Sequence, residues 1–207
     1  MRREIFAQKV FPLFSFSLVI MTIGAFAGMF IPPALYLPVS IAYFLVLILT
    51  YFVRSIPAIN LIMFCALVFL SGTLTAPIII AGLKVGGLNI IVNALGMTTI
   101  VMIGLAGYVY ITRADFTWLG PIVSVSLILI IIISFISGFL GAGINEIVLS
   151  VAGLIIFMGF VLYDMSAILR RYDDDEYIMA TISLYFDFLN IFINILRILI
   201  ASHNDKD

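Results

Sequence analysis

Long, uninterrupted apolar runs constrain this chain more than any other feature of its sequence. Seven such runs can be distinguished, each about as long as the 20 residues that a helix needs to cross a bilayer. They cover residues 10–31, 34–52, 56–80, 88–111, 118–137, 147–169 and 177–200. Only 10% of the 207 residues are charged, against about 25% in a soluble domain. We therefore predict an all-α polytopic membrane protein, in which residues 1–207 form one domain of seven transmembrane helices.

The distribution of lysine and arginine predicts the orientation in the membrane. With seven crossings, one side carries Arg2, Arg3, Lys9, Arg54, Arg113, Arg170 and Arg171, and the other carries Lys84, Arg197 and Lys206. The side richer in basic residues is normally cytoplasmic. We expect an integral membrane protein with a cytoplasmic N-terminus.

Metal and haem chemistry has little support in the sequence. Cys65 is the single cysteine and lies in an apolar run, and His203, the single histidine, lies in the polar C-terminal tail. No Cys/His cluster could hold zinc or haem. We expect that the protein has no cofactor and no nucleic-acid partner, and that the lipid bilayer surrounds it.

A polar stripe runs along the last apolar segment. Its members recur at spacings of four, three, four and three residues, which places them on one face of a helix: Ser183, Asp187, Asn190, Asn194 and Arg197. Hydrogen bonding between helices explains the serine and the asparagines. It explains the aspartate less well, because carboxylates inside a membrane are costly and usually functional. The stripe is therefore predicted to face the bundle interior or to line a pore.

A second membrane aspartate offers a partner for Asp187. Asp164 lies six residues before Arg170, and Asp187 lies 11 residues beyond Glu176, which is about 9 Å and 16 Å of helix from the same side. Residues 147–169 and 177–200 form a hairpin across a short loop, so the two acids lie at similar depths. We expect them to lie close enough to share a hydrogen bond.

Two facing acids in this setting predict a pH-sensitive latch. Burial and a neighbouring carboxylate both disfavour ionisation, and the pair should titrate as a unit. A shared proton holds the helices together, whereas two negative charges push them apart. The same oxygens suit a hard cation, so Asp164 and Asp187 are also candidate calcium ligands. Arg54, on the same predicted side, is a candidate partner for an ionised aspartate.

These residues also carry a resemblance to a known family. The segments "LYDMSAIL" and "ISLYFDFLNIFINILRIL", together with "GMTTIVMIGLAGYVYITRADFTWLG", resemble the transmembrane Bax inhibitor motif, or Bax inhibitor-1, family. The resemblance implies six helices around a central seventh and a calcium leak gated by a di-aspartyl pair. It matches Asp164 and Asp187 to that pair, Arg54 to an arginine that latches it, and Arg197 to an arginine of the last helix. The small size resembles prokaryotic members, which implies a prokaryotic cell membrane.

Three other functions compete with a calcium leak channel. A proton-coupled calcium exchanger would use the same two acids for Ca²⁺ and H⁺ in turn. An intramembrane aspartyl protease also has two membrane aspartates, but such enzymes carry Gly-x-Gly-Asp before the second acid, where this chain has Leu184, Tyr185 and Phe186. A protein that restrains cell-death partners follows from the family name alone. We therefore expect a calcium leak with protonation as its gate, and no enzyme.

Overall fold

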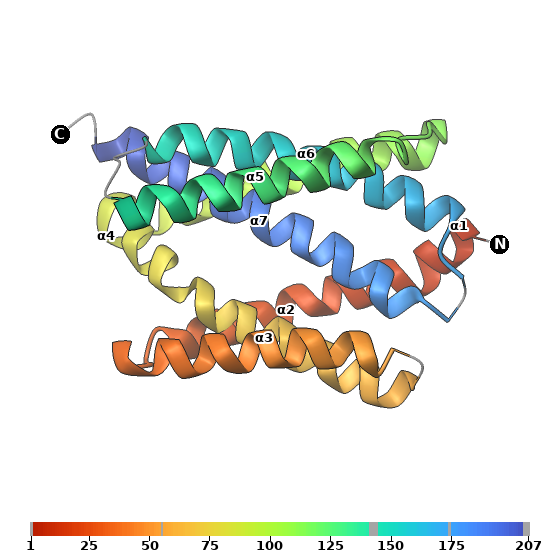
Figure 1. Ribbon diagram of the computed structural model, residues 1–207, viewed down its shortest axis with the longest axis horizontal. Helices are drawn as coiled ribbons and strands as arrows, with labels where there is room; N and C mark the ends of the chain where they lie inside the picture. The colour runs from red at the N-terminus through yellow and green to blue at the C-terminus, as the bar shows by residue number, and fades with distance from the viewer. Residues whose placement is uncertain (1, 55, 141–144, 174, 205–207) are drawn as a thin grey trace. The chain divides into compact units, whose positions relative to one another are not determined.

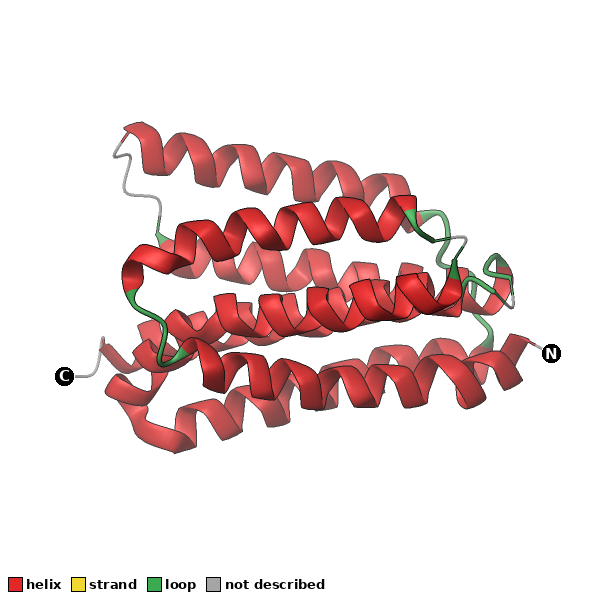
Figure 2. Ribbon diagram, turned by 90° about the horizontal axis from the view of Figure 1, so that it is seen from below, coloured by secondary structure: helices red, strands yellow, loops and turns green. Residues whose placement is uncertain are grey.

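The computed structural model describes residues 2–54, 56–140, 145–173 and 175–204. Throughout these ranges the regular structure is helical, and no strand occurs (Figure 2). The helices, shown in Figure 1, are α1 (Arg2–Ile5), the π-helix η1 (Phe6–Val10), α2 (Phe11–Gly28), the 3₁₀ helix η2 (Pro33–Leu35), α3 (Tyr36–Phe52), α4 (Pro57–Thr112), α5 (Leu119–Leu140), α6 (Glu146–Arg170) and α7 (Tyr177–Asn204).

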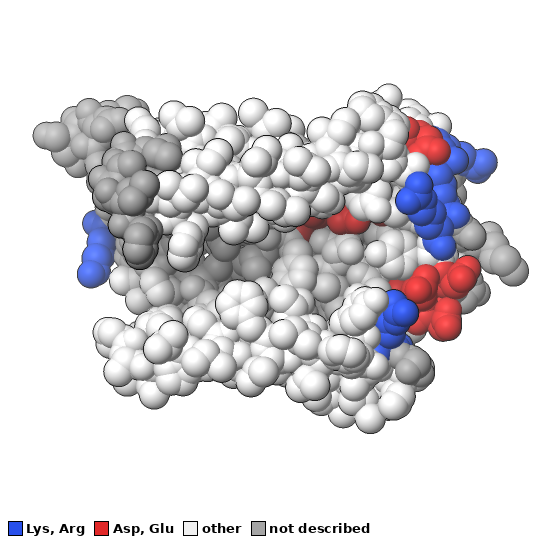
Figure 3. Space-filling view, in the orientation of Figure 1, with Lys and Arg blue, Asp and Glu red and all other residues white. Residues whose placement is uncertain are grey.

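Six of these helical segments are long and apolar enough to cross a membrane. They are Phe6–Gly28, Pro33–Phe52, Pro57–Thr112, Leu119–Ile136, Glu146–Arg170 and Tyr177–His203. In the space-filling view, broad surfaces carry no charge, and the charged side chains gather mainly near helix ends (Figure 3). Helices suit the interior of a lipid bilayer because their backbone N–H and C=O groups form hydrogen bonds with each other within one segment. The all-helical membrane fold predicted from the sequence is therefore confirmed.

The non-helical break between the third and fourth apolar runs is shorter than the sequence predicts. The sequence suggested a break over residues 81–87, yet α4 continues through this stretch and leaves helical geometry only at Gly87 (φ 62°, ψ −156°). A residue without Cβ reaches this positive φ at little cost. A straight helix of 56 residues would be about 84 Å long, more than twice the hydrocarbon thickness. The break therefore occurs in an element too long for one crossing.

The chain forms two compact units. The first contains Met1–Ile80 and Arg171–Tyr185, and the second contains Ala81–Arg170 and Phe186–Asp207. In the first unit, α2 meets α4 at glycines. A Cβ on Gly24 would lie 2.2 Å from the Phe69 carbonyl oxygen, and one on Gly72 would lie 2.3 Å from that of Met21. The Thr73 hydroxyl donates across this contact to the Gly24 carbonyl at 3.2 Å. Small residues let membrane helices approach until their backbones touch, which is what holds this crossing together.

The first unit also contains the beginning of α7. Tyr185 is fully buried, and its hydroxyl lies 2.5 Å from the hydroxyl of Ser71 on α4. At the start of α7, the ammonium group of Lys9 lies 5.4 Å from the centre of the Tyr177 ring. These contacts fix the first two turns of α7 within this unit.

In the second unit, α6 packs against α5 through two glycines. A Cβ on Gly120 would lie 2.5 Å from the Tyr163 ring, and one on Gly159 would lie 2.7 Å from the Val123 side chain. At the start of α6 the Asn145 side chain accepts the Ile147 N–H at 2.8 Å, which is an ordinary N-cap. α6 thus carries Asp164 on a helix that is capped at its start and closely packed along its length.

Candidate functional site

The candidate site lies where α6 and α7 bring two carboxyl groups together in the second unit. Asp164 is 8% exposed and Asp187 is 2% exposed. Their carboxyl groups lie within hydrogen-bonding reach of each other. A carboxylate only accepts, so a hydrogen bond between the two requires that one of them holds a proton. The expected proximity of these acids is therefore confirmed, and the geometry suits one shared proton.

The surroundings of Asp187 are buried and apolar, so ionising both carboxyl groups at once is unfavourable. Its Oδ2 atom is buried and has no hydrogen-bond partner among the residues that the structure describes. Neighbouring residues on both helices are buried and apolar, including Phe188 and Ile191 on α7 and Met165 on α6. A buried, charged oxygen atom without a hydrogen bond loses its solvation without compensation. The arrangement therefore disfavours two ionised carboxylates at this position.

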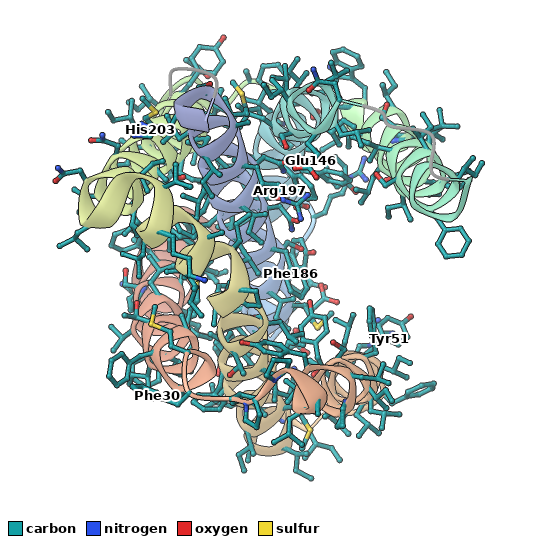
Figure 4. The ribbon with its side chains drawn as sticks, turned by 90° about the vertical axis from the view of Figure 1, so that its left-hand side faces the viewer. Phe30, Tyr51, Glu146, Phe186, Arg197 and His203 are labelled. Atoms are coloured by element: carbon teal, nitrogen blue, oxygen red, sulfur yellow. The ribbon has the colours of Figure 1, made fainter. Side chains whose placement is uncertain are left out.

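The polar stripe of α7 is less uniform than its spacing suggested. Asn194 is buried, and Ser183 and Asn190 are half-buried. Arg197, which was expected to face the interior, is exposed, and Figure 4 labels it on α7 together with Glu146 at the start of α6. An exposed Arg197 is compatible with a position along a pore, so the role predicted for it stays a prediction.

Asn194 marks a second close contact between α6 and α7. A Cβ on Gly153 would lie 2.8 Å from Asn194 Oδ1 and 3.0 Å from Nδ2. Asn194 Nδ2 donates to the Asn190 carbonyl at 2.8 Å, which fixes the amide. Gly153 precedes Asp164 by about three helical turns and Asn194 follows Asp187 by about two, so both contacts use the same helix faces. Helices α6 and α7 are thus in contact at two levels, through the two aspartates and through Gly153 and Asn194.

Gly153→Ala should destabilise this hairpin by about 1–3 kcal/mol, since the added methyl group overlaps the Asn194 side chain. The free energy of unfolding in detergent measures the effect. The double variant Gly153→Ala/Asn194→Ala should recover most of the loss. Gly96→Ala is the matched control, because a Cβ there has no heavy atom within 4 Å. Equal stabilities of Gly153→Ala and Gly96→Ala would contradict the close contact.

Arg54 belongs to the other unit, where its guanidinium group lies 4.8 Å from the centre of the Tyr51 ring. Its side chain is exposed. This contact occupies one face of the guanidinium group and fits an arginine at a membrane interface. The role of Arg54 as a latch for the acids stays a prediction.

Sequence reasoning missed Ser166, two residues beyond Asp164. Ser166 is fully buried, accepts the Phe116 N–H at 3.1 Å and donates to the Ala114 carbonyl at 3.3 Å. It therefore attaches the turn between α4 and α5 to α6. A polar serine in an apolar helix, on the face opposite Asp164, could have indicated a buried contact. Its partners could not be predicted, because they are backbone groups, which every residue carries.

As a calcium site the acid pair offers few ligands. Within the described ranges no group of three or more His, Cys, Asp or Glu residues could hold a metal ion. Two carboxyl groups supply at most four oxygens, whereas Ca²⁺ takes about six to eight. The pair alone therefore supplies fewer oxygens than a resident calcium ion takes, and calcium binding by Asp164 and Asp187 stays a prediction.

The fold and this site together define a class: an α-helical integral membrane protein with two buried, facing aspartates on its last two helices. The model of the family described as "Inhibitor of apoptosis-promoting Bax1" matches residues 3–204. The chain therefore belongs to the Bax inhibitor-1 family, as its resemblance implied.

Relatives of the chain agree with this assignment. A protein of Helicobacter pylori is 35% identical over 208 residues, which cover 98% of this chain and 88% of the relative. A Vibrio cholerae protein described as a membrane protein is 36% identical over 117 residues, 56% of this chain and 52% of its own length. The BI1-like protein of Arabidopsis thaliana is 37% identical over 120 residues, 56% of this chain and 47% of its own length. The similarity thus extends from bacteria to plants.

Proposed function

We propose that this protein is a calcium leak channel of a bacterial cell membrane, gated by the protonation of Asp164 and Asp187. The observation that supports the proposal most strongly is the contact between two buried carboxyl groups on neighbouring membrane helices. Ionisable groups in this position are costly and usually serve transport. Membership of the Bax inhibitor-1 family agrees with this proposal.

The gate follows from simple electrostatics. With one proton shared, the hydrogen bond between the acids joins α6 to α7, and the path for ions is closed. When the proton leaves, two negative charges face each other, and unit charges at 4 Å repel by about 4 kcal/mol at an effective dielectric constant of 20. Repulsion of this size shifts an equilibrium between closed and separated helices by several hundredfold. The calcium flux should therefore rise as the pH rises through the range in which the pair loses its proton.

The proposed topology has seven crossings, with the N-terminus in the cytoplasm and α7 at the centre of the bundle. The break at Gly87 supports it, because it divides α4 into two parts of adequate length. Buried residues on different sides of α7, including Tyr185, Ile191 and Asn194, support a central helix. The excess of basic residues on one side supports the orientation.

Calcium flux into liposomes that contain the purified protein tests this function. Ca²⁺ moving down its own gradient, without a pH gradient, is the result expected of a leak channel. Movement that requires an opposite flow of protons would instead identify an exchanger that uses the same acids. Liposomes that take up no more Ca²⁺ than protein-free liposomes, in either condition, would contradict transport altogether.

Arg54→Ala should raise the flux at high pH and leave it unchanged at low pH, because a countercharge matters only once the pair has ionised. The increase should be no more than about fivefold, since exposed ion pairs contribute up to about 1 kcal/mol. Arg171→Ala, at another exposed arginine, is the matched control for a lost positive charge. Identical flux profiles for the two variants would remove Arg54 from the gate.

A further inference from the structure

The turn between α4 and α5 is held in a conformation that its sequence alone does not favour. Arg113 follows the last residue of α4 with φ 58°, the left-handed region that residues with a Cβ rarely adopt. Two residues on, the Asp115 carboxylate accepts the Thr117 N–H at 2.9 Å and leads the chain toward α5. A strained residue in a short turn persists only when its surroundings hold it.

Four contacts from α6 supply that support. The buried hydroxyl of Ser166 accepts from the Phe116 N–H and donates to the Ala114 carbonyl. One helical turn further, the Arg170 guanidinium donates to the Arg113 carbonyl, and its Nε lies 3.6 Å from an oxygen of Asp115. Residues 166 and 170 share one helix face. All four contacts belong to the second unit, and together they form a clamp between the turn and the end of α6.

The clamp lies behind the acid pair. Ser166 follows Asp164 by two residues, which is about 200° of rotation and 3 Å of rise. The serine therefore faces the turn while the aspartate faces Asp187 across the contact with α7. A helix fixed on one face at this level can neither rotate nor slide easily, so its opposite face is fixed as well.

We infer that Ser166, assisted by Arg170, is a positioning residue that holds Asp164 against Asp187 by fixing α6 to the turn at Arg113–Phe116. The inference rests on the proposed function in that the acid pair is taken as the gate. Ser166 carries most of the effect, because it is buried and satisfies two backbone groups, whereas the Arg170–Asp115 pair is exposed and contributes little as an ion pair.

Infrared spectroscopy of the full protein in liposomes tests the positioning without relying on transport. The C=O stretching band of a protonated carboxyl group shifts to higher frequency when its hydrogen bond is lost, and Asp164→Asn and Asp187→Asn assign the band. Ser166→Ala should replace the hydrogen-bonded band with one at higher frequency, and Arg170→Gln should do so partially. The calcium flux of both variants should rise at low pH, where the wild-type protein is closed.

Two controls and an exchange measurement complete the test. Ser134→Ala removes an exposed serine that bonds only within α5, and Arg171→Gln removes an exposed arginine next to Arg170; both should keep the wild-type band. Hydrogen exchange over residues 113–118 should accelerate in Ser166→Ala and Arg170→Gln. Faster exchange with an unchanged carboxyl band in both variants would overturn the positioning role. A shifted band in a protein that passes no calcium would support positioning and contradict the proposed function.

Discussion

Replacing Asp187 with asparagine is expected to abolish the pH dependence of calcium flux and to leave the protein closed across the whole pH range. The asparagine amide can donate a hydrogen bond to Asp164 whether or not Asp164 is ionised. The variant also loses the repulsion between two carboxylates, which is about 4 kcal/mol for unit charges at 4 Å and an effective dielectric constant of 20. Flux at high pH should then fall by two orders of magnitude or more relative to the wild-type protein, as that energy converts at about 1.4 kcal/mol per factor of ten.

Asp164→Asn should behave in the same way, since either substitution removes one member of the pair. Glu146→Gln is the matched control, because it removes an exposed carboxylate from the start of the same helix, α6. It should retain the wild-type pH profile. An Asp187→Asn protein with the profile of the wild type would show that the gate lies elsewhere and that this aspartate is structural.

Gly24→Ala is expected to have the largest effect on stability, a loss of about 3 kcal/mol or more. The new methyl carbon would lie 2.2 Å from the Phe69 carbonyl oxygen, so α2 and α4 must separate. Their separation also breaks the hydrogen bond from the Thr73 hydroxyl to the Gly24 carbonyl. The obstacle is backbone and cannot move aside, unlike the Asn194 side chain that faces Gly153.

The free energy of unfolding in detergent measures this effect, with Gly104→Ala as the control. Gly104 lies in α4, and a Cβ there has no heavy atom within 4 Å. The control should be unchanged or stabilised by up to about 1 kcal/mol, because alanine favours a helix more than glycine does. A Gly24→Ala protein as stable as Gly104→Ala would contradict the close approach of α2 and α4.

Much of this architecture could be predicted because the physical signals are local in sequence. Apolar length identifies membrane helices, and the distances of Asp164 and Asp187 from their shared loop place both acids at similar depth. The spacing of the α7 stripe correctly placed Asp187 and Asn194 in buried positions. Arg197 belongs to the same stripe but is exposed, because periodicity gives the shared face of a helix and not the depth at which each residue is buried.

Other features depend on contacts between distant parts of the chain. The Ser166 hydroxyl bonds to backbone atoms about 50 residues away, and no residue type marks those atoms. The close approaches of Gly24 and Gly153 likewise depend on which helix lies opposite. At residues 81–87 the composition suggested a loop, but only Gly87 leaves helical geometry. One residue without a Cβ is enough to reach the positive φ of this break, so the composition overestimated its length.

The most direct test of the gate is a pH titration that follows the carboxyl band and the calcium flux in the same liposomes. The proton of the Asp164–Asp187 pair is proposed to control passage, so the two signals should change together, with coincident midpoints. In Asp187→Asn the shared-proton band should be absent and the flux constant. A wild-type flux that changes at a pH where the carboxyl band does not would contradict gating by this pair.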